Sequence, residues 1–263
     1  MYMTLEDRIL VELHRAGNLS GRPGIVVPSN DLREVKERLG DQRVRDALKR
    51  LVHSGRALSV RQDLLVLPDA TGRITVGIAD LIDAIAPRPY LITGGRALEV
   101  HHLTNQHSFS VVTLVPRSVR EFAFRGERAI FIETRETRIW GWVKGGPHLA
   151  LPERALLDAV TSPRYGVPFS MAIEALHGAA ERDSNFINKL ARAARRYDSA
   201  AVSRRLGLLV EKCCGHDAAE PFRNLLGESR TPVLLRPGGL PNGKIDTAWR
   251  VVVNASIQLE SVN

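Results

Sequence analysis

Apolar positions near the N-terminus recur in a way that predicts three helices followed by a hairpin. Spacings of three and four residues indicate helices over residues 5–16, 30–39 and 41–54. Short apolar runs at 57–60 and 64–67 indicate two strands around a polar turn. Three helices followed by a hairpin are typical of a winged helix-turn-helix, a fold that commonly binds DNA.

A short break separates the second and third helices. Ser29 or Asn30 can cap the second helix, and Gly40 suits the position just past its end. Asp41 can cap the third helix, which therefore begins almost at once, and Gly55 stops it. The second and third helices are accordingly expected to form the helix-turn-helix.

The pattern changes after residues 71–73, which are polar and contain a glycine. We predict an α+β protein with a winged-helix domain at 1–70 and a larger mixed domain at 74–263. The periodicity of the larger domain indicates helices at 78–85, 96–103, 152–160, 170–179, 185–197, 200–210 and 218–226, and strands at 90–93, 108–115, 129–142, 233–236 and 248–254.

Charge favours an anionic partner. Lys and Arg number 37 against 29 Asp and Glu, which gives a formal net charge of +8. Such a balance favours nucleic acid first and an anionic membrane surface second. The sequence contains no apolar run long enough to span a membrane, its start lacks the pattern of a signal peptide, and its two cysteines, Cys213 and Cys214, are adjacent. We therefore expect a cytoplasmic protein that binds double-stranded DNA.

The polar face of the third helix carries the candidate DNA-reading residues. Arg can pair bidentately with guanine and Gln with adenine when the start of such a helix enters the major groove. The candidate base contacts are Gln42, Arg43, Asp46 and Lys49, and the candidate backbone or wing contacts are Arg45, Arg50, Arg56 and Arg61. The alternative is a solvated amphipathic helix in a winged helix that binds protein.

A second basic stretch spans residues 182–212. Its helix after Asn185 can turn apolar residues inward while a basic face points outward, which suits contact with phosphates. The residues of this possible second DNA surface are Lys189, Arg192, Arg195 and Arg196. A merely solvated helix face explains the same pattern equally well.

The candidate motifs for catalysis or cofactor binding each lack a required residue. Gly238 and Gly243-Lys244 have the spacing of a phosphate-binding loop, but Ile245 stands where the magnesium-binding Ser or Thr is needed. Cys213, Cys214 and His216 have no second ligand pair at zinc-finger spacing. We therefore predict a protein that is not an enzyme and has neither a cofactor nor a metal.

The chain resembles the AbiEi family of antitoxins in three further segments. These are Tyr-Leu-Ile-Thr-Gly-Gly-Arg-Ala-Leu at 90–98, leading to His-His-Leu-Thr at 101–104, Leu-Pro-Glu-Arg-Ala-Leu-Leu-Asp at 151–158, and Trp-Arg-Val-Val-Val-Asn at 249–254. The second is similar to the family's Ser-Pro-Glu-Arg-Ala-Leu-Leu-Asp, with Leu151 in place of the serine. That serine is a helix cap, so the replacement affects only the cap.

The resemblance implies a repressor that acts as the antitoxin of a toxin-antitoxin operon and autoregulates it. It implies binding to inverted repeats in the operator, a site that a dimer can fill, and a nucleotidyltransferase-like toxin as functional partner, with direct contact left open. The alternatives are a DNA-binding regulator unconnected to any toxin and a toxin-binding interaction protein.

Overall fold

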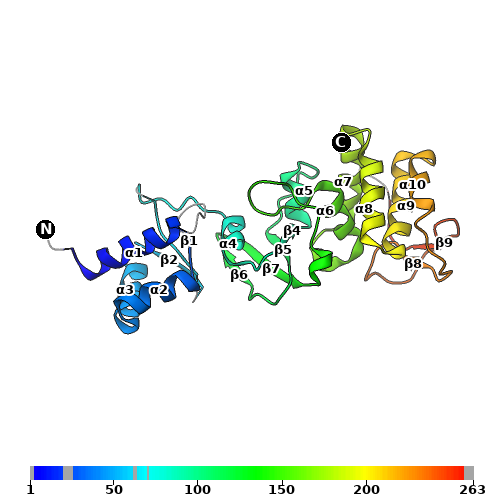
Figure 1. The fold of residues 1–263 in the computed structure, drawn as a ribbon. Coiled ribbons are helices and arrows are strands. Elements are labelled where there is room, and N and C mark those ends of the chain that lie inside the picture. Colours follow the sequence, from blue (N-terminus) through cyan, green and yellow to red (C-terminus); the bar gives the residue numbers. More distant parts are fainter. Residues whose placement is uncertain (1–2, 20–25, 62–63, 70, 258–263) are drawn as a thin grey trace. The chain divides into compact units, whose positions relative to one another are not determined.

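The computed structural model describes residues 3–19, 26–61, 64–69 and 71–257. The chain divides into two compact units (Figure 1). Unit 1 consists of Met1–Arg88 with Val119–Ile130, and unit 2 consists of Pro89–Ser118 with Phe131–Asn263. Helices and small sheets occur in both units, which confirms the predicted α+β class.

Unit 1 begins with the elements of a winged helix. They are α1 (Leu5–Leu19), β1 (Val26–Pro28), α2 (Ser29–Leu39), α3 (Asp41–His53), β2 (Leu58–Arg61) and β3 (Leu64–Val66). The three strands form an antiparallel sheet in the order β1-β3-β2. Strand β1 was not predicted, because three residues that end in a proline carry too little strand pattern.

The apolar periodicity of the three helices builds one core. Ile9 and Leu13 of α1, Val35 of α2 and Val44 and Leu51 of α3 all belong to it, and each is at most 1% exposed. Burying such side chains contributes about 1.5–3 kcal/mol each. The core leaves the opposite face of α3 toward solvent.

The helix ends correct two predicted caps. The cap of α2 is Pro28, and Ser29 is the first helical residue. Gly40, with a φ of 91°, ends α2 and also precedes α3, so Asp41 is the first residue of α3 and not its cap. A left-handed backbone at this single position favours glycine and lets α3 follow α2 directly.

The boundary between the units differs from the predicted one. Residues 71–73 form a turn, in which Asp69 Oδ1 accepts hydrogen bonds from the backbone N–H groups of Thr71 at 2.8 Å and Arg73 at 3.0 Å. Unit 1 continues through α4 (Ile78–Ile85). A later segment of the chain also belongs to this unit, and its strand β6 (Phe122–Phe124) packs against β2. No local sequence pattern predicts a contact between segments so far apart.

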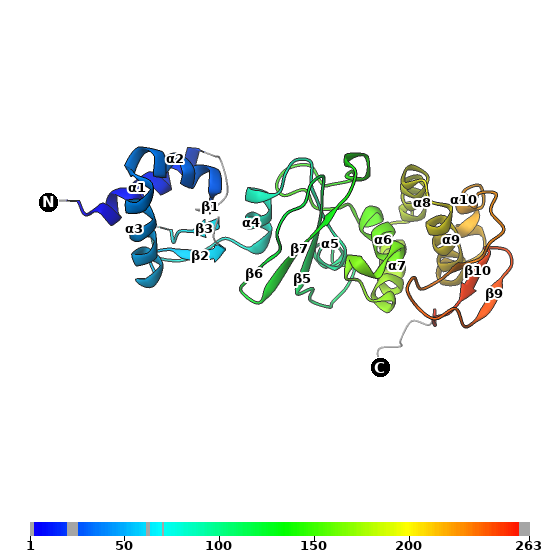
Figure 2. The ribbon, with the colours of Figure 1, turned by 90° about the horizontal axis from the view of Figure 1, so that it is seen from below.

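Unit 2 is helix-rich and contains several short strands (Figure 2). Its elements, with β7 shared between the units, are β4 (Leu91–Thr93), α5 (Gly95–Val100), β5 (Ser110–Val115), β7 (Glu127–Glu133), α6 (Pro152–Thr161), α7 (Phe169–Arg182), α8 (Phe186–Tyr197), α9 (Ala200–Cys214), α10 (Glu220–Arg223), β8 (Val233–Leu234), β9 (Lys244–Asp246) and β10 (Val251–Val253). The sheet orders are β4-β5-β7-β6 and β8-β10-β9.

Several predicted elements of this region are shorter than expected. The strand predicted at 129–142 ends at Glu133 and gives way to a short 3-10 helix, Glu136–Arg138. The helix predicted at 96–103 ends at Val100, and the one at 218–226 is reduced to a 3-10 turn and α10. Strands β6 and β9 were not predicted, because charged residues or turn signals flank each of them and neither lies in an apolar run.

The motif segments build the core of unit 2. Arg154 and Asp158 of α6 form an ion pair that is almost completely buried, and Asp158 also accepts a hydrogen bond from Thr93 of β4. Trp249 is fully buried against Gly207 of α9, where an added Cβ would lie 1.9 Å from the indole ring. These conspicuous residues therefore hold the fold together.

Candidate nucleic-acid interface

The face of α3 that points away from the core carries the predicted base contacts. Gln42, Arg43 and Lys49 are exposed, while Asp46 is half-buried. The side-chain amide of Gln42 donates to both carboxylate oxygens of Asp46 at 3.1 Å. This pair fixes the orientation of two of the four candidates before any ligand is present.

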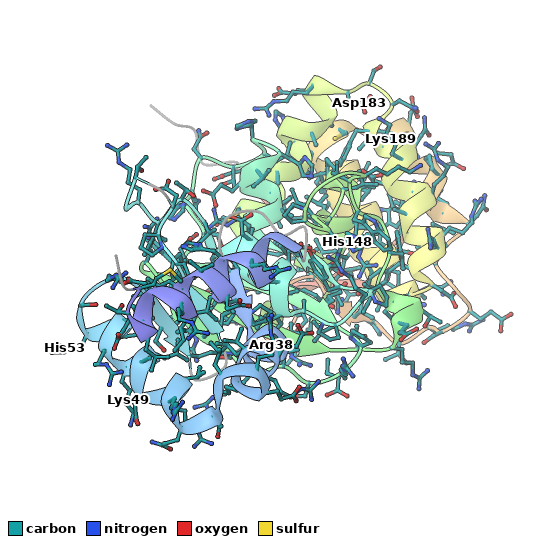
Figure 3. All side chains as sticks on the ribbon, turned by 60° about the vertical axis from the view of Figure 1, so that its left-hand side comes forward. Arg38, Lys49, His53, His148, Asp183 and Lys189 are labelled. Carbon is teal, nitrogen blue, oxygen red and sulfur yellow. The ribbon has the colours of Figure 1, made fainter. Side chains whose placement is uncertain are left out.

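Arg43 and Lys49 are the available cations of this face. Neither makes an ion pair or a side-chain hydrogen bond within the part of the chain that the structure describes. Figure 3 shows Lys49 together with His53 at the outer side of α3. An exposed, uncompensated cation on such a helix is free to bind a guanine edge or a phosphate.

The predicted backbone contacts are engaged with carboxylates of their own unit. Arg45 pairs with Asp41, Arg50 Nε lies 2.5 Å from Glu6 Oε1, and Arg56 Nη2 lies 2.5 Å from Asp7 Oδ1. These pairs sit at the surface, where an ion pair contributes only about 0–1 kcal/mol. A DNA phosphate can therefore displace such a carboxylate at low energetic cost.

The carboxyl groups of these pairs titrate below their ordinary range. The hydrogen bond from Arg56 lowers the pKa of Asp7, and the hydrogen bond from Arg45 lowers the pKa of Asp41. The pKa of Glu6 is lowered first by its own backbone hydrogen bond and then by Arg50. All three are therefore negatively charged at neutral pH, which reduces the net positive charge around α3.

Arg61, a predicted wing contact, lies in β2 and is bound within its own unit. Its Nη1 donates a hydrogen bond of 2.6 Å to the backbone carbonyl of Arg120, and its guanidinium lies 5.9 Å from the centroid of the Phe122 ring. A contact between Arg61 and DNA stays a prediction. Arg61 attaches the wing to β6, whose position the local sequence could not indicate.

A groove of about 680 Å³ lies beside the exposed face of α3. Its apolar floor includes Leu32, Leu48 and Leu65, and its cationic lining includes Lys36 and Lys49. The linear sequence does not single out Lys36, because only the packing of α2 against α3 brings this residue to the groove. The groove combines charge with apolar surface within the winged helix.

The second predicted DNA surface, on α8, is only partly available. Arg192 and Arg195 are exposed and make no ion pair among the residues described. Lys189 forms an ion pair with Asp183, with a distance of 2.7 Å between Nζ and Oδ2. Both residues are labelled in Figure 3. The guanidinium of Arg196 lies 4.5 Å from the centroid of the Trp140 ring, so it has a structural role.

The basic character of residues 182–212 is weaker at the surface than the sequence suggests. Arg204 is 1% exposed and donates to the carbonyls of Leu226, Ser229 and Thr231. Arg205 donates to the carbonyl of Leu234 at 2.7 Å. Burial lowers the pKa of both guanidinium groups, but their charges serve internal hydrogen bonds and offer little to a phosphate.

The other candidate features of the sequence concern metal ligands, thiols and membrane-spanning helices. Among the described residues, no group of three His, Cys, Asp or Glu side chains is placed to hold a metal ion. Burial raises the pKa of Cys213 to about 11, so this thiol stays protonated at neutral pH. Within those same residues, no helix is both long and apolar enough to cross a membrane.

Comparison with known proteins identifies a structural neighbour and no family. No family model matches the chain, and no curated protein matches it. A solved structure, that of the RV2827C protein from Mycobacterium tuberculosis, is similar with a TM-score of 0.57 at 12% sequence identity. The likeness covers 91% of this chain and 89% of that chain, and at this identity it shows the fold alone.

Proposed function

We propose that this protein is a DNA-binding transcriptional repressor that reads its operator with α3. One observation carries the proposal: Arg43 and Lys49 project from the exposed face of the third helix of a winged-helix arrangement, uncompensated by any carboxylate in the described residues. Phosphate contacts by basic residues supply affinity, and base contacts from α3 supply specificity.

The repressor is further proposed to be the antitoxin of a toxin-antitoxin operon that it autoregulates from the cytoplasm. Support comes from the resemblance to AbiEi antitoxins, whose motif residues include Thr93, Arg154, Asp158 and Trp249. In this chain these residues are packing residues of unit 2. They support a common architecture, while the functional partner, a nucleotidyltransferase-like toxin, rests on the resemblance.

Direct measurement of DNA binding tests this proposal. The full chain is titrated against a fluorescent duplex from upstream of its own gene and against a scrambled duplex of equal length and composition. The expected result is preferential binding to the upstream duplex, with an affinity ratio that falls in the range of specific regulators, roughly 10³ or more. Equal binding to both duplexes, or to neither, would overturn the proposal.

The groove beside α3 favours one other candidate function, that of a winged helix that binds a protein such as the toxin. Its apolar floor of Leu32, Leu48 and Leu65 is the kind of surface that protein interfaces bury. This candidate predicts co-purification with the product of a neighbouring nucleotidyltransferase-like reading frame and no operator binding. A gene neighbourhood without such a reading frame would instead favour a regulator unconnected to any toxin.

A further inference from the structure

A short hairpin from the middle of the chain, Val119–Ile130, belongs to the same compact unit as the winged helix. It consists of β6 and the first part of β7, which pair antiparallel with Phe122 opposite Ala129. Strand β6 packs against β2, a strand of the predicted wing. The hairpin is therefore placed beside the wing although it is encoded far from it.

Two arginines anchor the hairpin to the rest of unit 1. Arg61 of β2 donates to the carbonyl of Arg120 at 2.6 Å and covers the Phe122 ring. Arg125 at the hairpin turn donates to the carbonyl of Ile74 at 2.7 Å. The chain just before β6 is thus bound to β2 of the wing, and the residue just after β6 is bound to Ile74, which follows the wing in the sequence. The hairpin therefore has a defined position within unit 1.

The hairpin keeps positive charge at its surface. Arg120 and Arg125 are exposed, and neither has a carboxylate partner in the described part of the chain. A bond to a carbonyl leaves the charge of Arg125 uncompensated. Arg73, which directly precedes Ile74, is also exposed and makes no ion pair among those residues. Arg128, in contrast, pairs with Glu121 at 2.8 Å.

The apolar side chains of the hairpin point away from solvent. Phe122 and Phe124 are 6% and 5% exposed. The exposed side therefore offers guanidinium groups without an apolar patch. Protein interfaces need a buried core of apolar contacts, whereas phosphates are bound by cations at a polar, hydrated surface. This composition favours a nucleic-acid backbone over a protein partner.

We propose that the Val119–Ile130 hairpin is a second wing, whose Arg120 and Arg125, with the neighbouring Arg73, bind phosphates of the DNA duplex that α3 reads. The inference rests on the proposed DNA-binding function and extends the interface beyond the residues that the sequence indicates. Contacts of this kind raise affinity for any sequence and do not discriminate between bases.

The test uses the full chain with Arg73→Gln and Arg120→Gln combined, because neither side chain makes a contact that folding needs among the described residues. Binding to the upstream and scrambled duplexes is measured by anisotropy over a series of salt concentrations. Each lost phosphate contact lowers the slope of log affinity against log salt by about 0.9, so the double variant should lose about 2 units with an unchanged specificity ratio.

Arg128→Gln is the matched control, since it removes the same charge from the same hairpin at an ion-paired position. Its slope is expected to equal that of the wild type. Two outcomes would overturn the second wing alone, provided that the wild-type chain binds DNA. In the first, the double variant has the same slope as the wild type. In the second, the slope changes by the same amount per arginine in the double variant and in the control. A wild-type chain that binds neither duplex would overturn the proposed function itself.

Discussion

The hydroxyl of Thr93 donates a hydrogen bond of 2.7 Å to Asp158 Oδ2 and thereby joins two motif segments that are 65 positions apart. Arg154 holds the same carboxylate with two bonds of 3.1 Å from Nε and Nη2. Burial raises the pKa of the Asp158 carboxyl, and the Arg154 guanidinium opposes that shift. The most distinctive motif of the sequence thus forms a buried network of unit 2.

Asp158→Asn should destabilise the protein strongly. The substitution leaves the Arg154 guanidinium buried without its counter-charge, which costs about 3–5 kcal/mol in the free energy of unfolding. Urea denaturation followed by circular dichroism measures the loss. As a control, Arg154→Met combined with Asp158→Leu removes both charges and should cost less than the single change. An Asn variant as stable as the wild type would show that the pair is not ionised.

Gly207→Ala should be destabilising although alanine favours helices. A Cβ at Gly207 would lie 1.9 Å from the Trp249 ring, so the ring or α9 must shift, at a cost of about 1–3 kcal/mol or more. Gly178 in α7 is the matched control, because no atom lies within 4 Å of its added Cβ. Gly178→Ala should stabilise by about 0.5–1 kcal/mol. Thermal melts that move in the same direction for both variants would contradict the close packing of Trp249.

The sequence predicted the elements with a long apolar period and missed those decided by distant contacts. Val35, Val44 and Leu51 fall at helical spacing, and each is buried as that spacing requires. Strands β1, β6 and β9 are short and are flanked by proline, glycine or charged residues, so they form no apolar run of their own. Local propensity is a weak guide for such short segments, because tertiary contacts determine them.

The candidate site was predicted in part for the same reason. The exposure of Arg43 and Lys49 follows from the wheel of α3, which is local. In contrast, the hydrogen bond from Arg61 to the carbonyl of Arg120 and the burial of Arg204 depend on segments that are distant in the sequence. Counting basic residues along 182–212 therefore overestimated the charge available to DNA, since a guanidinium is also a good donor to internal carbonyls.

Arg192→Gln combined with Arg195→Gln tests the surface of α8. If these exposed arginines bind phosphates, the slope of log affinity against log salt should fall by about 2 units per protomer. Arg196 is left unchanged because it covers Trp140. Sedimentation velocity checks that the molecular mass is unaltered, so that lost association is not mistaken for lost contact. A slope equal to that of the wild type would show that the basic face of α8 is solvated and does not bind DNA.

The central claim is that α3 reads bases, and the specificity ratio of Arg43→Ala tests it most directly. This ratio compares the affinities for the upstream and the scrambled duplex. Arg15→Ala on α1 is the control, since it removes the same charge from an exposed residue outside α3. Loss of a bidentate base contact should lower the ratio by about 5- to 150-fold, equivalent to about 1–3 kcal/mol, while the control leaves it unchanged. If Arg43→Ala weakened both duplexes equally and kept the ratio, α3 would not be the reading helix.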